Sequence, residues 1–198
     1  MSVINDGTGK GNKAKVDGSN RLHAYAVTRS EAGSAVHEER AYNINTGLIT
    51  LTTAGESGVC YVYNNEPKAL IVTGIVAILG PSTGGASTDI TRVRIYKNVT
   101  TGTLVSAATD VDTISNRDFG SSETLTANVY KGTEGSTITD GTVHIESLIN
   151  PGSRVFFAID EELPKGHSIA VSFEPNDSNT SMKCMAAVIC HLEDEELE

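Results

Sequence analysis

Glycine and lysine are concentrated between residues 6 and 22, DGTGKGNKAKVDGSNRL, and these two residue types together could bind a phosphate group. A G-x-x-x-x-G-K-[ST] loop built on Gly9 and Lys10 needs glycine at position 4 and serine or threonine at position 11. The chain has Ile4 and Gly11 there. The glycine spacing also differs from that of the dinucleotide-binding fingerprint. The segment is therefore not predicted to bind a nucleotide.

Cys184, Cys190 and His191 resemble a set of metal ligands in the sequence. On a strand that rises about 3.3 Å per residue, the two cysteines would lie about 20 Å apart. His191 would also point to the opposite face from Cys190. The cysteines are therefore predicted to be small buried thiols in a core strand, with no bound metal.

Carboxylates occur in two places where they could bind calcium or transfer protons. Asp110, Asp112 and Asn116 lack the further oxygen ligands and the closing glutamate of a calcium loop, so turn roles are expected for them. Glu161 and Glu162 precede an L-P-K-G sequence and are predicted to lie in a solvated turn. The five histidines are dispersed, and no serine lies in a G-x-S-x-G elbow. No enzyme and no cofactor is predicted, although a site assembled from distant residues stays open.

Most of the chain consists of short β-rich runs separated by turn residues, a pattern typical of an all-β protein. Residues 68–79 are apolar on both faces and predict a central strand. In 90–98, Val93 and Ile95 are predicted to face inward, and Arg92, Arg94 and Tyr96 outward. In 58–64, the alternation places Val59, Tyr61 and Tyr63 on one face of a strand and Cys60 and Val62 on the other. The remaining predicted strands are 48–53, 154–159, 167–173 and 182–192. About eight strands predict a β-sandwich, with a jelly roll as the favoured topology.

The segments between these runs are predicted from weaker patterns. Residues 21–29 read as a first extended segment, and 33–42 as a polar connection. Residues 100–107 resemble the return arm of a hairpin. Residues 108–152 have few apolar positions and predict a long excursion with one or two short strands.

Charge divides the chain into a basic start and an acidic end. Residues 1–30 carry five basic and two acidic residues, a net charge of +3, within a chain whose net charge is −10. We therefore expect a basic arm over residues 1–20, a sandwich domain over 21–192 and an acidic tail over 193–198. Two merely solvated tails are the alternative. The overall acidity excludes a general nucleic-acid binder.

Cysteine content and hydropathy set the expected compartment. An odd number of cysteines, three, disfavours a disulfide framework, and residues 1–20 show no signal peptide. The longest apolar run, ALIVTGIVAILG at 69–80, is too short to span a bilayer. The expectation is a soluble protein made in a reducing cytoplasm, with no membrane partner.

Three stretches together resemble a group of tailed-bacteriophage virion proteins: residues 64–85, 96–132 and 163–182. They contain N-R-D-F-G-S-S, L-P-K-G-x-S-I and N-T-S-M, and the similarity extends over roughly residues 5–192, including the glycine- and lysine-rich start. His167 departs from the small polar residue expected at its position. The resemblance is to head decoration (cement) proteins, which implies a jelly-roll trimer on the capsid exterior.

If the resemblance holds, the arm would order against another protein, and Lys10, Lys13, Lys15 and Arg21 would contact acidic patches on the major capsid protein. A second candidate contact patch consists of Asn116, Arg117 and Phe119, because arginine and phenylalanine in a polar segment are interface-type residues. The alternative for this patch is a local staple, with Phe119 packed onto the sandwich.

Three functions are therefore carried forward. The first is a non-enzymatic virion protein that forms a homotrimer on the capsid and braces neighbouring capsomers. The second is a fibre, vertex or baseplate component, or a sandwich that binds host glycans through some of the six tyrosines. The third is an enzyme whose site is not recognisable from sequence.

Overall fold

The computed structural model describes residues 30–81, 90–106, 109–176 and 181–193, together with the backbone of residues 15–16 and 22–23. The chain divides into two compact units, Met1–Ser30 and Glu31–Glu198. In the first unit, strands β1 (Lys15–Val16) and β2 (Leu22–His23) pair in an antiparallel ladder. Most of the predicted arm, including Lys10, Lys13 and Arg21, lies outside the described residues, as does the acidic tail beyond Glu193.

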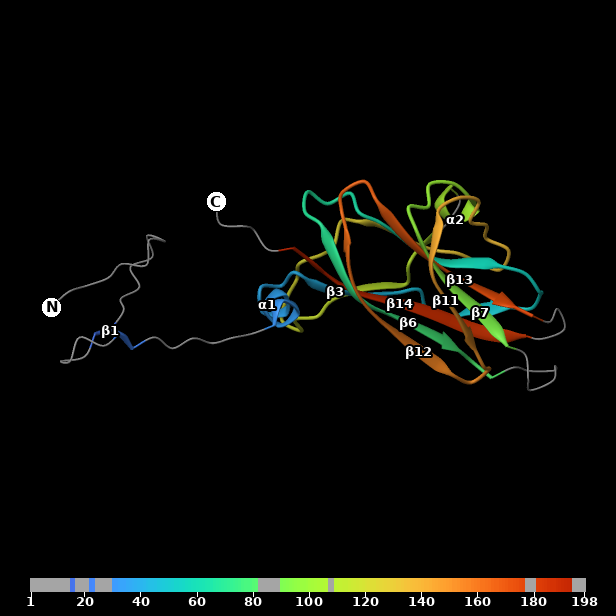
Figure 1. The fold of residues 1–198 in the computed structure, drawn as a ribbon, viewed down its shortest axis with the longest axis horizontal. Helices are drawn as coiled ribbons and strands as arrows, with labels where there is room; N and C mark the ends of the chain where they lie inside the picture. Colours follow the sequence, from blue (N-terminus) through green and yellow to red (C-terminus); the bar gives the residue numbers. More distant parts are fainter. Residues whose placement is uncertain are drawn as a thin grey trace. The chain divides into compact units, whose positions relative to one another are not determined.

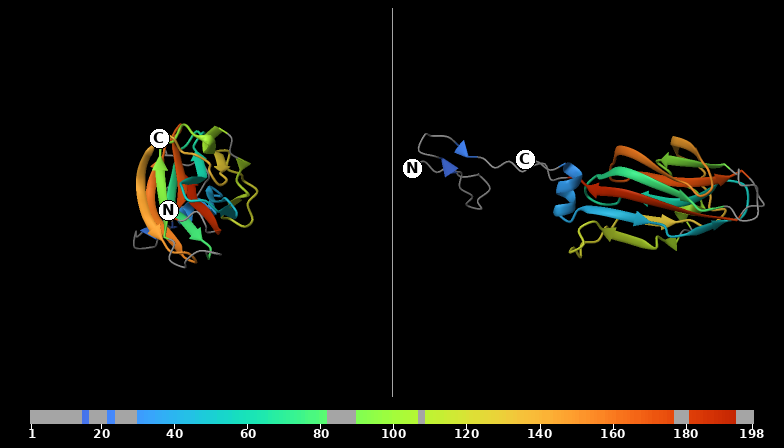
Figure 2. Two further views of the ribbon diagram at one scale, coloured as in Figure 1. Left: turned by 90° about the vertical axis from the view of Figure 1, so that its right-hand side faces the viewer. Right: turned by 90° about the horizontal axis from the view of Figure 1, so that it is seen from below.

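The second unit is a sandwich of two antiparallel sheets (Figures 1 and 2). The first, the β7 sheet, contains β5 (Ser57–Tyr63), β7 (Thr91–Lys97), β8 (Thr109–Asp110), β10 (Asn128–Lys131), β11 (Thr142–Ile149) and β13 (Ser168–Pro175). The second, the β6 sheet, contains β3 (Ala41–Asn45), β4 (Ile49–Leu51), β6 (Leu70–Leu79), β9 (Thr113–Asn116), β12 (Arg154–Leu163) and β14 (Met182–Leu192). The prediction of an all-β sandwich is therefore confirmed.

The order of the strands is that of a jelly roll. The β7 sheet runs β11-β7-β13-β5-β10-β8, and the β6 sheet runs β12-β6-β14-β3-β9 with β4 beside β14. If β3, β5, β6, β7 and β11 to β14 are numbered one to eight along the chain, the sheets read 5-4-7-2 and 6-3-8-1. Successive strands of this set cross between sheets at every step except from β7 to β11, which gives the two interleaved Greek keys of a jelly roll.

The core forms because apolar residues alternate along strands that bury one face each. Val93 and Ile95 of β7 are fully buried, as predicted, and they belong to one cluster with Ile75 of β6 and Val188 of β14. Strand β6 lies between β12 and β14, which confirms its predicted central position. The strands with the clearest apolar patterns thus provide the core residues on the inner faces of both sheets.

Residues Glu31–His37 form helix α1, although a polar connection without a helix was predicted over 33–42. Its buried residue is Ala35, and it ends where Glu39 adopts a left-handed conformation with φ 62°. Arg40 N–H donates to the carbonyl of Ala35 at 2.8 Å and Glu39 N–H to that of Val36 at 3.1 Å, which is a Schellman cap. Strand β3 follows, and Figure 2 shows α1 at the end of the sandwich where β3 begins and β14 finishes.

The predicted hairpin arm over 100–107 is wrong. Thr103–Ser106 form a short helix, α2, and β7 pairs with β11 and β13 instead. Leu104 of α2 is fully buried with Tyr61, Val99 and Ala170 in a second cluster on the outer face of the β7 sheet. A helix of four residues has no detectable period, so its apolar residue read as part of a strand.

Two further expectations differ from the structure. The segment 108–152 was expected to hold one or two short strands, but it contains β8, β9, β10 and β11, and β11 is an edge strand of the β7 sheet. In β5, Val59 was expected to share a face with Tyr61, but Val59 lies in the main core with Cys60 and Val62. The cause is a β-bulge: the register of β5 against β13 shifts between Gly58 and Cys60.

The turn predicted around Glu161 and Glu162 begins later than expected. Strand β12 continues through both residues to Leu163, and His167 N–H closes the turn by donating to the carbonyl of Pro164 at 3.1 Å. Glu161 and Glu162 are both exposed, as predicted. The pairing of β12 with β6 is irregular between Ala158 and Glu161, so the acidic pair follows a bulge in an edge strand.

Candidate docking site

Phe119 is the most exposed large apolar residue in the described part of the chain. Its relative exposure is 104%, and it lies in the loop of residues 117–121 that follows β9, here called the Phe119 loop. The alternative in which Phe119 packs onto the sandwich as a local staple is wrong. Arg117, the neighbouring candidate, is half-buried and contributes its backbone N–H to the carbonyl of Ala41 at 2.8 Å.

The Phe119 loop is held in one conformation by two successive side-chain turns. Asn116 Oδ1 accepts from the backbone N–H of Asp118 at 2.9 Å, and Asp118 Oδ1 accepts from that of Gly120 at 2.9 Å. Ser121 N–H donates to the carbonyl of Asp118 at 3.1 Å. The loop therefore presents the Phe119 ring on an ordered backbone.

Glu39, the residue with the left-handed backbone, attaches the loop to the end of α1. Its carbonyl accepts from Asn116 Nδ2 at 2.6 Å, and its Oε2 accepts from Ser121 Oγ at 2.8 Å. A non-glycine residue in this conformation costs about 1–2 kcal/mol. The bonds on both sides of the Phe119 loop stabilise it there. Of the three predicted contact residues, Asn116 thus holds the loop backbone through its hydrogen bonds, and Phe119 is the exposed side chain that the loop presents.

An acidic pocket lies beside the Phe119 loop, at the same end of the sandwich. Its volume is about 300 Å³, and it is lined by Glu38, Glu39, Arg40, Tyr42, Glu66, Pro67, Lys68, Glu123 and Leu192. Glu66 is buried, with 8% of its surface exposed. Its Oε1 accepts from both the N–H of Thr126, at 2.6 Å, and the hydroxyl of Thr126, at 2.8 Å. These bonds connect the β5–β6 turn to the segment that follows the Phe119 loop.

Tyr42 is one of the residues that line the acidic pocket. Only 3% of its surface is exposed, yet no hydrogen bond reaches its hydroxyl from the described residues. Burial raises the pKa of Tyr42, and the negative charges of Glu123, Glu66 and Glu39 raise it further. The hydroxyl therefore lies in the field of three carboxylates.

Sequence reasoning did not find this pocket. Glu66 lies between the predicted strands 58–64 and 68–79, and Glu39 lies in the predicted polar connection over 33–42; neither position indicates a site. The lining residues come from the connection between α1 and β3, from β3, from the β5–β6 turn, from the segment before β10 and from the end of β14. No local pattern joins segments so far apart in the chain.

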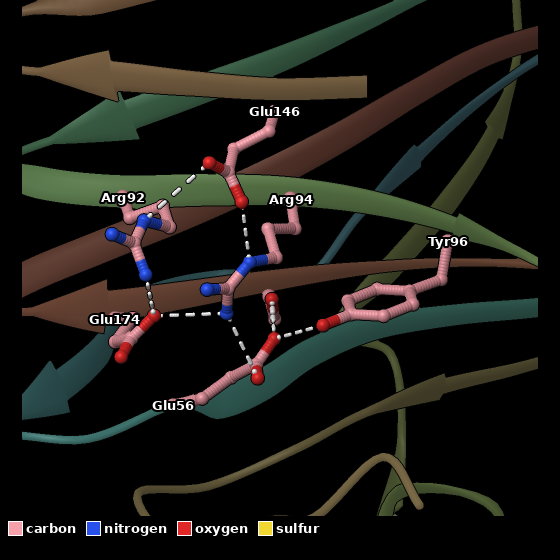
Figure 3. A network of polar contacts seen from close by, with 7 residues as sticks. Glu56, Arg92, Arg94, Tyr96, Glu146 and Glu174 are labelled. Carbon is pink, nitrogen blue, oxygen red and sulfur yellow. Dashed lines mark hydrogen bonds and ion pairs between the residues drawn. The ribbon is translucent and has the colours of Figure 1, made fainter. Parts of the chain in front are cut away.

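A second polar feature covers the outer face of the β7 sheet, where Arg92, Arg94 and Tyr96 face outward as predicted (Figure 3). Arg94 is in contact with three carboxylates: Glu146 at 2.7 Å, Glu174 at 2.8 Å and Glu56 at 3.0 Å. Arg92 reaches Glu174 at 3.1 Å. We call this set the arginine ladder; its members are Glu56, Arg92, Arg94, Tyr96, Glu146 and Glu174.

Glu56 is the most enclosed carboxylate of the arginine ladder. Burial alone would raise its pKa, but hydrogen bonds from Ser172 Oγ at 2.5 Å and Tyr96 Oη at 2.7 Å outweigh it, with the charge of Arg94 adding to them. The net result is a lowered pKa for Glu56. For Tyr96, burial and its bond to Glu56 raise the pKa to about 12. Each charge in the ladder is thus compensated by neighbouring strands.

No arrangement suited to metal binding occurs among the described residues, which contain no group of three or more histidines, cysteines and carboxylates placed to hold an ion. The three cysteines are free and buried, and burial raises the pKa of each thiol to about 12. His144 lies 3.2 Å from Glu161, and His167 Nδ1 lies 2.9 Å from Asn98 Oδ1, at separate surface positions. No helix in the described ranges has the length and apolar character needed to cross a membrane.

Comparisons with known proteins give no family for this chain. No protein-family model matches it, and no curated protein matches it. Among solved structures, the chain is similar to the Yersinia pseudotuberculosis-derived mitogen, with 15% sequence identity and a TM-score of 0.37 over 79% of this chain and 90% of that chain. A TM-score this low carries no argument about what the chain does.

Proposed function

We propose that this chain is a non-enzymatic virion structural protein of a tailed bacteriophage, a decoration protein that docks on the capsid exterior and braces neighbouring capsomers. The exposed, ordered Phe119 loop is the observation that carries the proposal. The loop holds a fully exposed aromatic side chain on an ordered backbone, and aromatic side chains are enriched at protein–protein interfaces.

The energetic argument rests on preorganisation. Association costs free energy when side chains and loops must become ordered. Asn116, Asp118 and Glu39 already hold the backbone of the Phe119 loop, so this cost is reduced before a partner arrives. A buried aromatic anchor at the centre of an interface typically contributes about 2–4 kcal/mol. Repetition of such a contact over a capsid lattice multiplies its effect through avidity.

The resemblance to decoration proteins and the docking site meet in one segment. N-R-D-F-G-S-S, one of the motifs that carry the resemblance, is the sequence from Asn116 to Ser122. Its Asn116, Asp118 and Ser121 make the hydrogen bonds of the loop, and its phenylalanine is the exposed ring. Because this motif lies in a surface loop and not in the core, its resemblance to the motif of decoration proteins favours a similar binding role.

The glycan-binding alternative finds no tyrosine platform among the described residues. Tyr42 and Tyr61 are buried, and Tyr63, Tyr96 and Tyr130 are half-buried. Tyr61 and Tyr130 stack on each other with ring centroids 6.0 Å apart. A sugar would need an exposed ring, whereas the five tyrosines in the described ranges are buried or half-buried.

The direct test is the occupancy of capsid shells by two matched variants. Phe119→Ala removes the exposed ring of the docking site, and Leu48→Ala removes an exposed apolar side chain, 66% exposed, beyond the end of β3 that is remote from α1. We expect Phe119→Ala to lower the affinity for shells stripped of the protein by at least about tenfold, and Leu48→Ala to leave it unchanged.

Both residues are exposed, so both variants should keep the wild-type unfolding midpoint. Equal binding by Phe119→Ala and wild type would contradict docking through this loop. Absence of binding by the wild-type chain to any shell of its phage would contradict the decoration role itself.

A further inference from the structure

The acidic pocket has the chemistry of a receptor for a primary ammonium group. Both bonds from Thr126 reach Oε1 of Glu66, which leaves Oε2 without a hydrogen bond among the described residues. The hydroxyl of Tyr42, a residue with 3% of its surface exposed, likewise has none there, and the exposed Glu123 adds a carboxylate. An ammonium group carries three donors and no acceptor, so these three acceptors match it in number and kind.

The charge of the pocket is also unbalanced. Four carboxylates and two cationic side chains line it, a difference of two negative charges. Arg40 is already paired with Glu38 at 2.6 Å. A lysine from another molecule would supply the missing positive charge, in a site where Glu66 and Tyr42 are shielded from water and the attraction is less screened.

The chain itself carries the complementary segment. Residues 1–30 have a net charge of +3, so the remaining residues 31–198 carry −10 − 3 = −13. The lysines are concentrated at Lys10, Lys13 and Lys15. Lys15 pairs with His23 in the β1–β2 ladder, and the eight steps from His23 to Glu31 span at most about 28 Å when extended, whereas a domain of this size has a radius of gyration of about 15 Å. A lysine of this segment can therefore reach the surface of an adjacent molecule.

We propose that the acidic pocket binds a lysine side chain from residues 10–15 of a second copy of this chain. The contact is heterologous, because a segment of one copy meets a pocket of the next, and it closes into a ring when the rotation between copies permits. The pocket thereby links copies to one another, in place of the capsid-protein contact first expected for these lysines. This interaction goes beyond the proposed function and does not depend on it.

Zero-length cross-linking of the full-length chain tests the contact. Copies labelled with ¹⁵N and unlabelled copies are mixed, carbodiimide joins lysine amines to carboxylates in contact, and mass spectrometry identifies the joined peptides. We expect mixed-label products between a peptide that contains Lys10, Lys13 or Lys15 and one that contains Glu66 or Glu123. Products with a single label only, or no product at these positions, would overturn the proposal.

Two variants assign the contact to the pocket. Glu66→Gln keeps an oxygen that can accept from Thr126, and Tyr42→Phe keeps the buried ring, so both should fold; a thermal melt verifies this. Glu162→Gln removes one charge from an exposed position on β12 and is the matched control. Because glutamine cannot form the cross-link, the yield is measured at Glu123: we expect Glu66→Gln to lower the mixed-label yield there about tenfold and Tyr42→Phe to lower it severalfold, with Glu162→Gln unchanged. Wild-type yield in both pocket variants would refute the site.

Discussion

Glu56 illustrates at the residue scale how the outer face of the β7 sheet accommodates charge. Its carboxylate accepts from Ser172 and Tyr96 and faces Arg94. Because its pKa in the folded chain lies below the ordinary value of 4.5, the folded state takes up the proton less readily than the unfolded state. The stability from this group is complete above pH 4.5 and is lost as the pH falls through the folded pKa.

We predict that Glu56→Gln lowers the free energy of unfolding by about 1–2 kcal/mol at pH 7, because glutamine can accept the two hydrogen bonds but leaves Arg94 with one carboxylate fewer. The difference from wild type should shrink as the pH falls below 4.5. Urea titrations at pH 7 and at pH 3 measure it. Asp160→Asn, which removes an exposed carboxylate from β12, is the control and should change little. A Glu56→Gln deficit that persisted undiminished at pH 3 would contradict this account.

The three cysteines give a second residue-scale prediction. Cys60, Cys184 and Cys190 are at most 1% exposed, and their thiol pKa values of about 12 leave almost no thiolate at neutral pH. A thiol reagent such as Ellman's reagent should detect no reactive cysteine in the native chain and all three in denaturant. Rapid labelling of even one thiol in native buffer would be inconsistent with the core described.

The sequence alone left the role of Phe119 undecided, and the reason is physical. Whether a phenylalanine in a polar loop is buried depends on whether an apolar surface lies within reach, which is a property of the fold. By contrast, Asn116 and Asp118 have side chains that bond locally, so a turn at their positions follows from residue type. The acidic pocket was invisible because Tyr42, Glu66 and Glu123 meet only in the folded chain.

At the element scale, α2 acts as a cover over the outer face of the β7 sheet. Leu104 is fully buried against Tyr61 and Ala170. Leu104→Ala should cost about 2–4 kcal/mol, because it opens a cavity that the short helix cannot close. Val105→Ala, at a half-buried position of the same helix, should cost less. Chemical denaturation followed by far-UV circular dichroism measures both losses, because the chain has no tryptophan for a fluorescence signal. Equal and small losses for the two variants would mean that α2 is not part of the cooperative core.

The elements that could be predicted from sequence are those buried on a regular pattern. Strands β6, β7 and β14 carry apolar residues with strand periodicity, and each lies inside its sheet. The elements that could not be predicted are short or marginal. Helix α1 has seven residues, and edge strand β11 alternates weakly because its residues are mostly exposed or half-buried. A pattern that reflects burial is weak wherever burial is incomplete.

At the scale of the whole molecule, a start with net charge +3 is joined to a remainder with −13. If copies associate through this asymmetry, raising the salt concentration from about 0.02 M to about 0.5 M should shift the full-length chain toward smaller species, because the Debye length falls severalfold. Sedimentation velocity at several salt concentrations measures the distribution. A distribution that is the same at every salt concentration would show that charge does not drive the association.

The central claim, a decoration protein on the capsid, is tested most directly by counting copies per virion. A protein that docks at repeated lattice positions must be present in numbers set by the lattice symmetry. Quantitative mass spectrometry of purified virions, with isotope-labelled peptides of this chain and of the major capsid protein as standards, gives the ratio. The account predicts hundreds of copies per particle; a few dozen or fewer would contradict it and would indicate a fibre, vertex or baseplate component instead.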